Sequence, residues 1–289
     1  MYKTIIIVLV FFSFFSCIRD VTFDEKDSPP EITINCILDT RKDTVTAYIS
    51  YSSPIQSEHQ FVPVKDLKIS LYENDSILGY FIWQVSTAYV FPFTANLGER
   101  YRIEIKMINK TIWAETTVPQ HVAASIEKSS FESDSYSISF IDNTQNSNFY
   151  WISASGFMGV EENRHKNIAC TIYSNFEYSD DFNRLTYKNG NYKYEFENYI
   201  RIYNKKLSDN NSKIIFSPQC ISRPIEIFLL STDYNLDKYM KSSLLMANID
   251  YYAEEVPIAY SPFPVYSNIH GGTGIFGSVT SVSKTFTRE

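Results

Sequence analysis

The chain has 289 residues and a net charge of −7, with 33 Asp and Glu against 26 Lys and Arg. No stretch concentrates basic residues, which argues against nucleic acid as a partner. Aromatic residues make up 16% of the chain, including 22 Tyr and 21 Phe. These residue types favour the half-buried surface of strands, so the composition predicts a mainly β protein of one large or two ordinary domains.

The first sixteen residues have the layout of a bacterial secretory signal. Lys3 is followed by an apolar run over residues 5–15, and Ser16 precedes Cys17. A small residue before a cysteine is typical of a lipoprotein signal, with Cys17 as the lipidated first residue of the mature chain. The run is short of the roughly 20 residues that a transmembrane helix needs, which disfavours a membrane-spanning anchor. An ordinary cleaved signal remains the alternative, because Phe14 and Phe15 are bulky for a lipobox.

Residues 17–30 form an acidic tether that contains Asp20, Asp24, Glu25 and Asp27 and ends at Pro29-Pro30. Residues 31–118 then predict an immunoglobulin-like or transthyretin-like β-sandwich, because seven short alternating segments are separated by turns about every ten residues. The predicted strands are 31–38, 43–51, 67–72, 77–83, 89–93, 101–107 and 112–118. A Gly turn leads into the strand that begins at Tyr101, a recurring feature of such modules.

Residues 119–289 predict a second β-rich domain that carries one helix. Strands are expected at 123–131, 135–142, 149–155, 199–203, 213–216 and 225–231, with long loops over 156–196. Apolar residues then recur at helical spacing, which predicts a helix over about 235–255. The tail, residues 262–277, contains Gly271, Gly272, Gly274 and Gly277. A phosphate loop would need a preceding strand, a following helix and usually a Lys, so we interpret these glycines as a structural turn or bulge.

Three cysteines remain if Cys17 is lipidated. An exported location permits a disulfide, and Cys170 with Cys220 would lie in one domain. The alternative is that Cys36, Cys170 and Cys220 are small buried hydrophobes. No CxxC spacing indicates a zinc or redox site.

The sequence gives only weak support for a metal site or a catalytic site. Glu161-Glu162 with His165 could supply ligands, but paired His spacing is missing, and a solvated loop fits better. Asp233-x-Asn235-x-Asp237 resembles the start of a calcium loop, but Lys238 occupies the position of the turn glycine, so a helix cap fits better. No nucleophile elbow occurs. We therefore expect no metal, no cofactor and no catalytic residue.

The aromatic residues supply the remaining candidates for binding. Trp83, Trp113 and Trp151 lie in alternating strands, which predicts core packing. The tyrosines of the polar 187–194 region lack such a framework, and they are the predicted contacts to a sugar or peptide ligand of unknown identity: Tyr187, Tyr192 and Tyr194.

The lipobox cysteine, the Ig-like first module, the proline junction, the helix and the tail "PVYSNIHGGTGIFG" together resemble the DUF4249 family of Bacteroidota lipoproteins. The family usually carries an acidic or apolar residue where His270 stands, so His270 is not a ligand candidate. The resemblance implies a cell-envelope lipoprotein encoded beside TonB-dependent outer-membrane receptors, and no established reaction. In that phylum, acidic residues after the cysteine direct lipoproteins to the cell surface; a periplasmic orientation is the alternative.

The resulting hypothesis is an outer-membrane lipoprotein, anchored by lipid, that acts as a non-catalytic binding or accessory subunit of a TonB-dependent uptake system. The alternative is a structural or adhesive surface lipoprotein. An unrecognised hydrolase ranks third, because no nucleophile or metal cluster is visible in the sequence.

Overall fold

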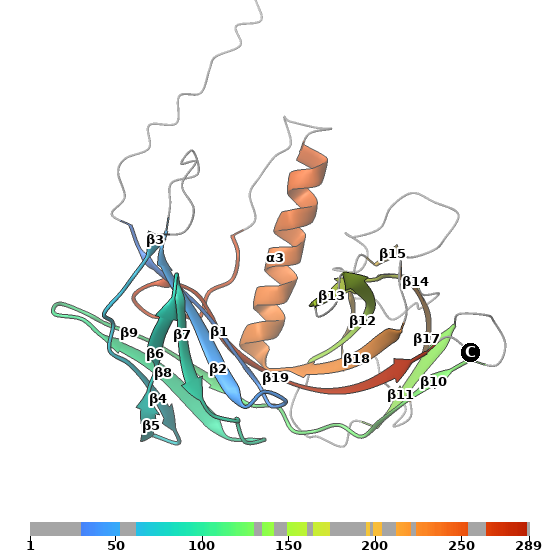
Figure 1. Ribbon diagram of the computed structural model, residues 1–289, viewed down its shortest axis with the longest axis horizontal. Coiled ribbons are helices and arrows are strands. Elements are labelled where there is room, and N and C mark those ends of the chain that lie inside the picture. The colour runs from blue at the N-terminus through green and yellow to red at the C-terminus, as the bar shows by residue number, and fades with distance from the viewer. Residues whose placement is uncertain are drawn as a thin grey trace, which may run out of the picture. The chain divides into compact units, whose positions relative to one another are not determined.

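The computed structural model describes residues 30–52, 62–129, 135–141, 149–160, 164–173, 195–196, 199–203, 212–220, 224–253 and 264–287. Residues 31–289 form one compact unit. Within the described ranges the chain is mainly β, with strands in three sheets and one long helix (Figure 1). No helix in these ranges is both long and apolar enough to cross a membrane.

The first part of the chain forms two facing sheets. The strands are β1 (Ile32–Asp39), β2 (Thr44–Tyr51), β3 (Val62–Pro63), β4 (Ile69–Glu73), β5 (Ser76–Tyr80), β6 (Ile82–Val85), β7 (Ala88–Pro92), β8 (Arg100–Lys106) and β9 (Thr111–Thr117). Strands β1, β2, β7 and β6 are neighbours in a ten-stranded sheet, and β5, β4, β8 and β9 make a four-stranded sheet. Alternate residues of both sheets enter one hydrophobic core. The predicted β-sandwich is therefore confirmed.

One predicted strand divides in two. The segment 77–83 was expected to be a single strand, but Phe81 separates β5 from β6 and the two pair in different sheets. The Phe81 side chain is buried in the core and its amide donates to the carbonyl of Ile69. The chain crosses here from one sheet to the other, so both β5 and β6 become edge strands. Periodicity alone does not show this, because the alternation continues through the crossing.

The Gly turn before β8 places a buried tyrosine against a carboxylate. Gly98 has a φ of 79°. The Tyr101 hydroxyl donates to Glu73 Oε1 at 2.5 Å and accepts the Asn96 amide at 2.9 Å. The hydrogen bond from Tyr101, with one from the Asn96 side chain, lowers the pKa of Glu73, while burial and the same carboxylate raise the pKa of Tyr101. The hydroxyl therefore ties the loop at 96 to the end of β4.

Replacing Tyr101 with Phe is expected to destabilise the fold by about 2 kcal/mol at neutral pH, because a hydrogen bond to a charged group is lost. A carboxyl whose folded pKa is depressed stabilises the protein above its unfolded pKa, near 4.3, and loses that contribution as the pH falls. The cost of Tyr101→Phe should therefore shrink in acid. Urea unfolding from pH 7 to pH 3 measures it.

Tyr89→Phe is the matched control, because the Tyr89 hydroxyl donates to a neutral acceptor, the Val64 carbonyl, at 2.7 Å. Its cost, about 1 kcal/mol, should stay constant over the same acid range. Equal pH dependence in both variants would contradict the assignment to Glu73.

The second part of the chain adds further strands around a second hydrophobic core. They are β10 (Ala124–Lys128), β11 (Tyr136–Phe140), β12 (Phe149–Val160), β13 (Arg164–Ala169), β14 (Thr171–Tyr173), β15 (Glu195–Phe196), β16 (Tyr199–Tyr203), β17 (Ser212–Gln219) and β18 (Ile225–Thr232). Strands β10, β11, β17, β14 and β15 form a five-stranded sheet, whereas β12, β13, β16 and β18 belong to the ten-stranded sheet. Long loops were expected within 156–196; the described part of this range contains the end of β12, then β13, β14 and β15, and its other residues lie outside the described ranges.

The last strand joins the two parts. Strand β19 (Thr273–Phe286) pairs parallel with β1 and antiparallel with β18. It completes the ten-stranded sheet, in which eight strands follow the order β13-β12-β18-β19-β1-β2-β7-β6 while β16 pairs with β12 and β3 with β2. Ile269 and Phe276 of the tail pack in the core of the N-terminal sandwich. The first sandwich is thus built from both ends of the described chain.

The predicted helix is confirmed as α3 (Tyr234–Ala253). Leu236 packs with Ile275 and Val279 of β19, and partly buried Tyr239 and Met240 border this cluster. Figure 1 shows α3 rising from the sheet at β19. The helix thus covers β19 on the face that points away from the sandwich core.

The glycines of the tail allow close backbone contact. Gly274 has a φ of 107°, and a Cβ atom at this position would collide with the Ile34 carbonyl oxygen of β1. A Cβ at Gly277 would lie 2.8 Å from the Cβ of Leu236 in α3. These glycines therefore let β19 fit between β1 and the helix, which agrees with a structural role.

Gly274→Ala is expected to cost about 2–3 kcal/mol, because alanine disfavours this φ and its methyl group strikes backbone atoms that cannot rotate away. Gly79→Ala is the control: its methyl group would meet the rim of the Phe91 ring, a side chain that can move. The expected cost there is below about 1 kcal/mol, because replacing a glycine inside a strand by alanine gains stability that offsets part of the contact. Thermal unfolding of both variants measures the difference, and equal losses would contradict a special requirement at Gly274.

Candidate functional site

Several sequence-predicted residues lie outside the described part of the chain. They are Cys17, Tyr187, Tyr192, Tyr194, Glu161 and Glu162. The backbone of His165 lies in β13. The lipidation site and the proposed ligand contacts therefore stay predictions.

The cysteines that are described divide into a pair and a single residue. Cys170 and Cys220 form a disulfide with their Cα atoms 4.7 Å apart. Cys36 is free and buried in the sandwich core, and burial raises the pKa of its thiol. A thiol held in its neutral form by an apolar environment is a poor nucleophile, so Cys36 serves packing.

No group of three or more His, Cys, Asp or Glu residues that could hold a metal ion occurs in the described ranges. His270 stacks on Trp113 with the ring centroids 4.1 Å apart, and the two backbones form an isolated bridge. This contact fixes the tail against β9. It gives His270 a packing partner that the sequence did not indicate.

The acidic pattern before α3 caps the helix, as predicted. Asp233 accepts the Leu236 amide at 3.0 Å and the Asn235 amide at 3.3 Å. It also accepts the Ser278 amide of β19 and the Thr116 hydroxyl of β9. Burial raises the pKa of Asp233 in spite of these four donors, which act in the opposite direction. The cap therefore also joins two strands that are far apart in sequence.

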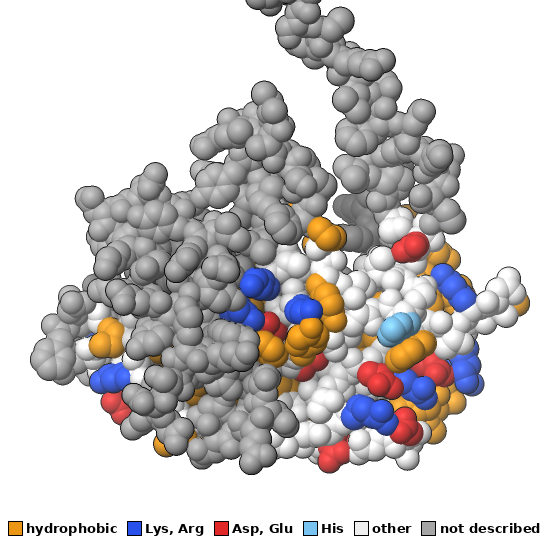
Figure 2. All heavy atoms as spheres, turned by 180° about the vertical axis from the view of Figure 1, so that it is seen from behind, with side chains coloured by type: hydrophobic (Ala, Val, Ile, Leu, Met, Phe, Trp, Pro, Cys, Tyr) orange, Lys and Arg blue, Asp and Glu red, His pale blue; other side chains and the backbone are white. Residues whose placement is uncertain are grey.

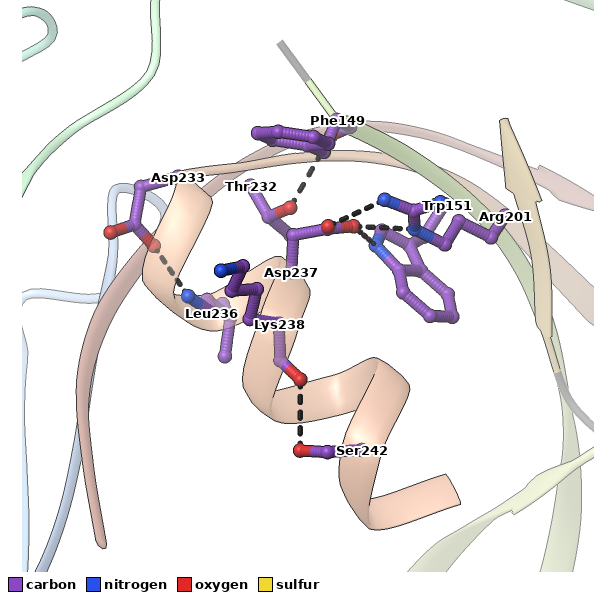
Figure 3. Close-up of polar contacts among 9 residues, drawn as sticks. All are labelled: Phe149, Trp151, Arg201, Thr232, Asp233, Leu236, Asp237, Lys238 and Ser242. Atoms are coloured by element: carbon purple, nitrogen blue, oxygen red, sulfur yellow. Dashed lines mark hydrogen bonds and ion pairs between the residues drawn. The ribbon is translucent and has the colours of Figure 1, made fainter. Parts of the chain in front are cut away.

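One turn later, Asp237 points to the opposite side of the helix start (Figure 3). Arg201 of β16 donates to both carboxylate oxygens, from Nε at 2.7 Å and from Nη2 at 2.6 Å. The Trp151 indole of β12 donates to Oδ1 at 3.0 Å. The Asp237 and Arg201 side chains are 2% and 5% exposed. This bidentate pair fastens α3 to the second part of the ten-stranded sheet.

The Asp237–Arg201 pair has the burial of an active-site group, but its carboxylate oxygens already accept three donors from the protein. We interpret it as a structural link. Sequence reasoning missed Arg201, although an arginine at the centre of the apolar segment Tyr-Ile-Arg-Ile-Tyr is a sign that a buried partner exists.

The three tryptophans differ in burial. Trp151 is fully buried, as predicted, and Trp113 is partly covered by His270. Trp83 was expected in the core, but it is 40% exposed. It lies on the edge strand β6, with the Lys65 ammonium 5.1 Å from its ring centroid. The strand crossing at Phe81 is the reason, because it takes β6 to the edge of the sheet.

The outer face of β1, β2, β7 and β6 exposes several large apolar side chains. Residues that alternate with the core positions point to this face: Ile37 on β1, Tyr48 on β2 and Ile82 on β6 are 42%, 54% and 65% exposed. The register places Tyr48 opposite Ala88, and Ile82 opposite Val90. We call Ile37, Tyr48, Ile82, Ala88 and Val90 the outer apolar face.

This face continues the surface that α3 covers. Asn35 is the register partner of both Tyr48 and Ile275, and residues paired in register point to the same side of a sheet. Ile275 packs against Leu236 of α3. The outer apolar face and the surface that α3 covers therefore lie on the same side of the sheet. No described element covers the part over β1, β2, β7 and β6. Contiguous exposed apolar patches of this kind mark interaction sites.

The four-stranded sheet presents a different surface. Its outer side carries Arg102, Glu104 and Lys106, with Lys106 Nζ 3.3 Å from Glu104, and Arg100 pairs with Asp75. Figure 2 shows basic and acidic side chains interspersed over this part of the molecule. Mixed charge is typical of a solvated surface, so the outer apolar face is the candidate functional site.

Comparison with known proteins gives a family and no activity. The family model described as "Domain of unknown function (DUF4249)" matches residues 18–285. No curated protein matches. Two of the solved structures that match are aligned over most of their length, with low TM-scores. The collagen-binding domain of Erysipelothrix rhusiopathiae surface protein RspB is 9% identical (87% of this chain, 96% of that one, TM-score 0.20), and the collagen adhesin CNA from S. aureus is 8% identical (89% and 93%, TM-score 0.17). Because the family model spans nearly all of the sequence, the chain belongs to the DUF4249 family.

Proposed function

We propose that the chain is an outer-membrane lipoprotein that acts as a non-catalytic binding or accessory subunit of a TonB-dependent nutrient uptake system. The observation that carries this proposal is the outer apolar face, a sheet surface with large exposed side chains and no described element over it. A subunit that docks on another protein needs such a surface, whereas an enzyme needs convergent polar groups in a pocket. The lipoprotein signal, with Cys17 as its lipidation site, would place this surface at the membrane.

The geometry supports docking through protein contacts. Tyr48 and Ile82 supply large, partly exposed side chains at the centre and at the edge of the face, and aromatic residues are enriched at interface hot spots. Ile37 extends the face towards β19. The unpaired edge of β6 lies beside them, although its four residues and the register shift after Trp83 limit strand addition. The partner would thus be held mainly by side chains.

The test is recovery of partners from native outer membranes. The lipidated chain is purified in detergent and co-purifying proteins are identified by mass spectrometry. We expect a stoichiometric TonB-dependent barrel, and we expect Tyr48→Glu or Ile82→Glu to lower its recovery at least about thirtyfold, the effect of losing a hot spot. Leu97→Glu is the control, because Leu97 is also exposed, at 42%, but lies in a loop at the end of the sandwich that carries ion pairs.

Recovery of the lipoprotein alone would overturn the proposal and favour the structural or adhesive alternative. A barrel that co-purifies equally with all three variants would preserve the accessory role and exclude the outer apolar face. Tyr187, Tyr192 and Tyr194 would then be the next residues to substitute, since they are the predicted contacts to a ligand.

A further inference from the structure

The N-terminal sandwich has two ends that differ in chemistry. At one end, β1 begins opposite the last residue of β2, as Ile32 pairs with Tyr51, and Gly272 lies close to both Ile32 and Ile112. The connection at 64–68, the β6–β7 turn and the β8–β9 turn lie at the same end. We call it the entry end, because the chain enters the fold there at Glu31. The far end carries the turns at 39–43, 73–76 and 96–100.

Apolar side chains project from the turns of the entry end. Ile108, in the β8–β9 turn, is fully exposed, and Val85, next to the β6–β7 turn, is 68% exposed. Val62 and Trp83 are also among the exposed large hydrophobic residues. An isoleucine at the tip of a two-strand turn has no packing role within the chain. Together these four residues make an apolar rim at the entry end, whereas the far end carries ion pairs beside the exposed side chains of Ile77 and Leu97.

Three lysines accompany this rim. Lys65 lies over the Trp83 ring and Lys68 over the Tyr80 ring, at 5.1 Å and 4.7 Å from the centroids. Lys110 donates to the Gly271 carbonyl at 3.3 Å. Among the described residues, none of these three ammonium groups has a carboxylate within 4.0 Å. At the far end, Asp39 pairs with Arg41 and Asp75 with Arg100.

Exposed aliphatic and aromatic tips together with lysines form the combination that proteins use at a lipid–water boundary. The apolar tips enter the headgroup region, and lysine ammonium groups remain at the level of the phosphates. The chain as a whole carries a charge of −7, so general attraction to an anionic surface is absent and a local cluster of lysines is needed. Glu31 and Asp66 are the described acids at the same end, against Lys65, Lys68 and Lys110.

We propose that the entry end rests on a bilayer with anionic headgroups, through Val62, Trp83, Val85 and Ile108 and the three lysines. The inference rests on the lipid anchor of the proposed function. Residues 18–30 reach at most about 45 Å when extended, so an anchor at Cys17 keeps the entry end near the membrane. The far end lies about 26 Å further along β1. Contact at the entry end orients the sandwich, with the outer apolar face directed sideways.

The test uses the full lipidated chain in vesicles of phosphatidylethanolamine and phosphatidylglycerol, compared with phosphatidylcholine vesicles. Single reporter cysteines are introduced as V85C, I108C and, at the far end, L97C, and labelled with an environment-sensitive fluorophore. The disulfide and the burial of Cys36 leave the introduced thiol as the reactive one. Flotation reports anchoring, and the emission wavelength and quenching by nitroxide lipids report contact.

We expect blue-shifted, lipid-quenched emission at positions 85 and 108 in anionic vesicles and aqueous emission at position 97. Lys65→Gln and Lys110→Gln should each lower the docked-to-undocked ratio about fivefold, the effect of one cation near an anionic bilayer. Lys42→Gln, at the far end, should leave the ratio unchanged. These differences should vanish in phosphatidylcholine.

A chain that floats while all three labels stay in water would overturn the inference and leave the anchor standing. A chain that does not float would overturn both. Lipid contact at position 97 instead of positions 85 and 108 would reverse the orientation and contradict the proposal. If positions 85 and 108 are shielded only when a barrel is reconstituted with the chain, the entry end binds a protein partner and the proposal is also wrong.

Discussion

Asp237→Ala is expected to lower the free energy of unfolding by about 3–5 kcal/mol, the range observed when one member of a buried ion pair is removed. The carboxylate accepts two hydrogen bonds from Arg201 and one from Trp151. Its removal leaves a buried guanidinium without that countercharge and an indole N–H without its acceptor. Because the pair links α3 to β16 and β12, the helix should detach more easily than the sheet unfolds.

Urea unfolding gives the global cost, and hydrogen exchange of the α3 amides reports its local release. The double variant Asp237→Leu/Arg201→Met is the control, since replacing both charges by apolar groups of similar volume is often neutral or stabilising. It should recover most of the loss. If the double variant is as unstable as Asp237→Ala, then the loss of the hydrogen bonds to Asp237, rather than the buried charge of Arg201, determines the effect.

Removal of the disulfide is the second large effect. The Cys170–Cys220 bond closes a loop of 50 residues, and the chain-entropy estimate for that length is about 4 kcal/mol. Cys170→Ala/Cys220→Ala should therefore unfold at markedly lower denaturant concentration than the native chain. Adding a reductant to the native chain should reproduce this result.

The same reductant should not change the stability of the double alanine variant, because the remaining described cysteine, Cys36, is free and buried. Unfolding curves with and without reductant measure both chains. A native chain whose midpoint does not move on full reduction, checked by thiol counting, would contradict a stabilising role for the bond.

The two effects concern the same part of the molecule. Arg201 lies in β16 and Trp151 in β12, whereas Cys170 directly precedes β14. The disulfide and the ion pair therefore both support the second part of the chain, while the first sandwich is held mainly by apolar packing and by the tail. Variants at Asp237 or at the disulfide should consequently leave the outer apolar face and the entry end intact, so partner and membrane assays remain interpretable in them.

Local patterns were sufficient for much of the fold. Alternation over 31–51 predicted β1 and β2, helical spacing predicted α3, and Asp233 was recognised as its cap. These succeed because each depends on residues close in sequence: a period of two for a strand, near 3.6 for a helix, and a side chain that reaches the amide three residues on. The family resemblance, carried by the lipobox and the tail, also depended on contiguous residues.

Only the tertiary structure decided which elements become neighbours. The parallel pairing of β19 with β1 joins residues about 240 positions apart. Arg201 of β16 pairs with Asp237 of α3, although the two residues lie in different elements. The exposure of Trp83, and with it the contribution of β6 to the outer apolar face and to the apolar rim, follows from the crossing at Phe81 that makes β6 an edge strand. Alternation shows that a residue points to one face or the other, but whether that face is covered depends on packing between distant segments, which no local pattern encodes.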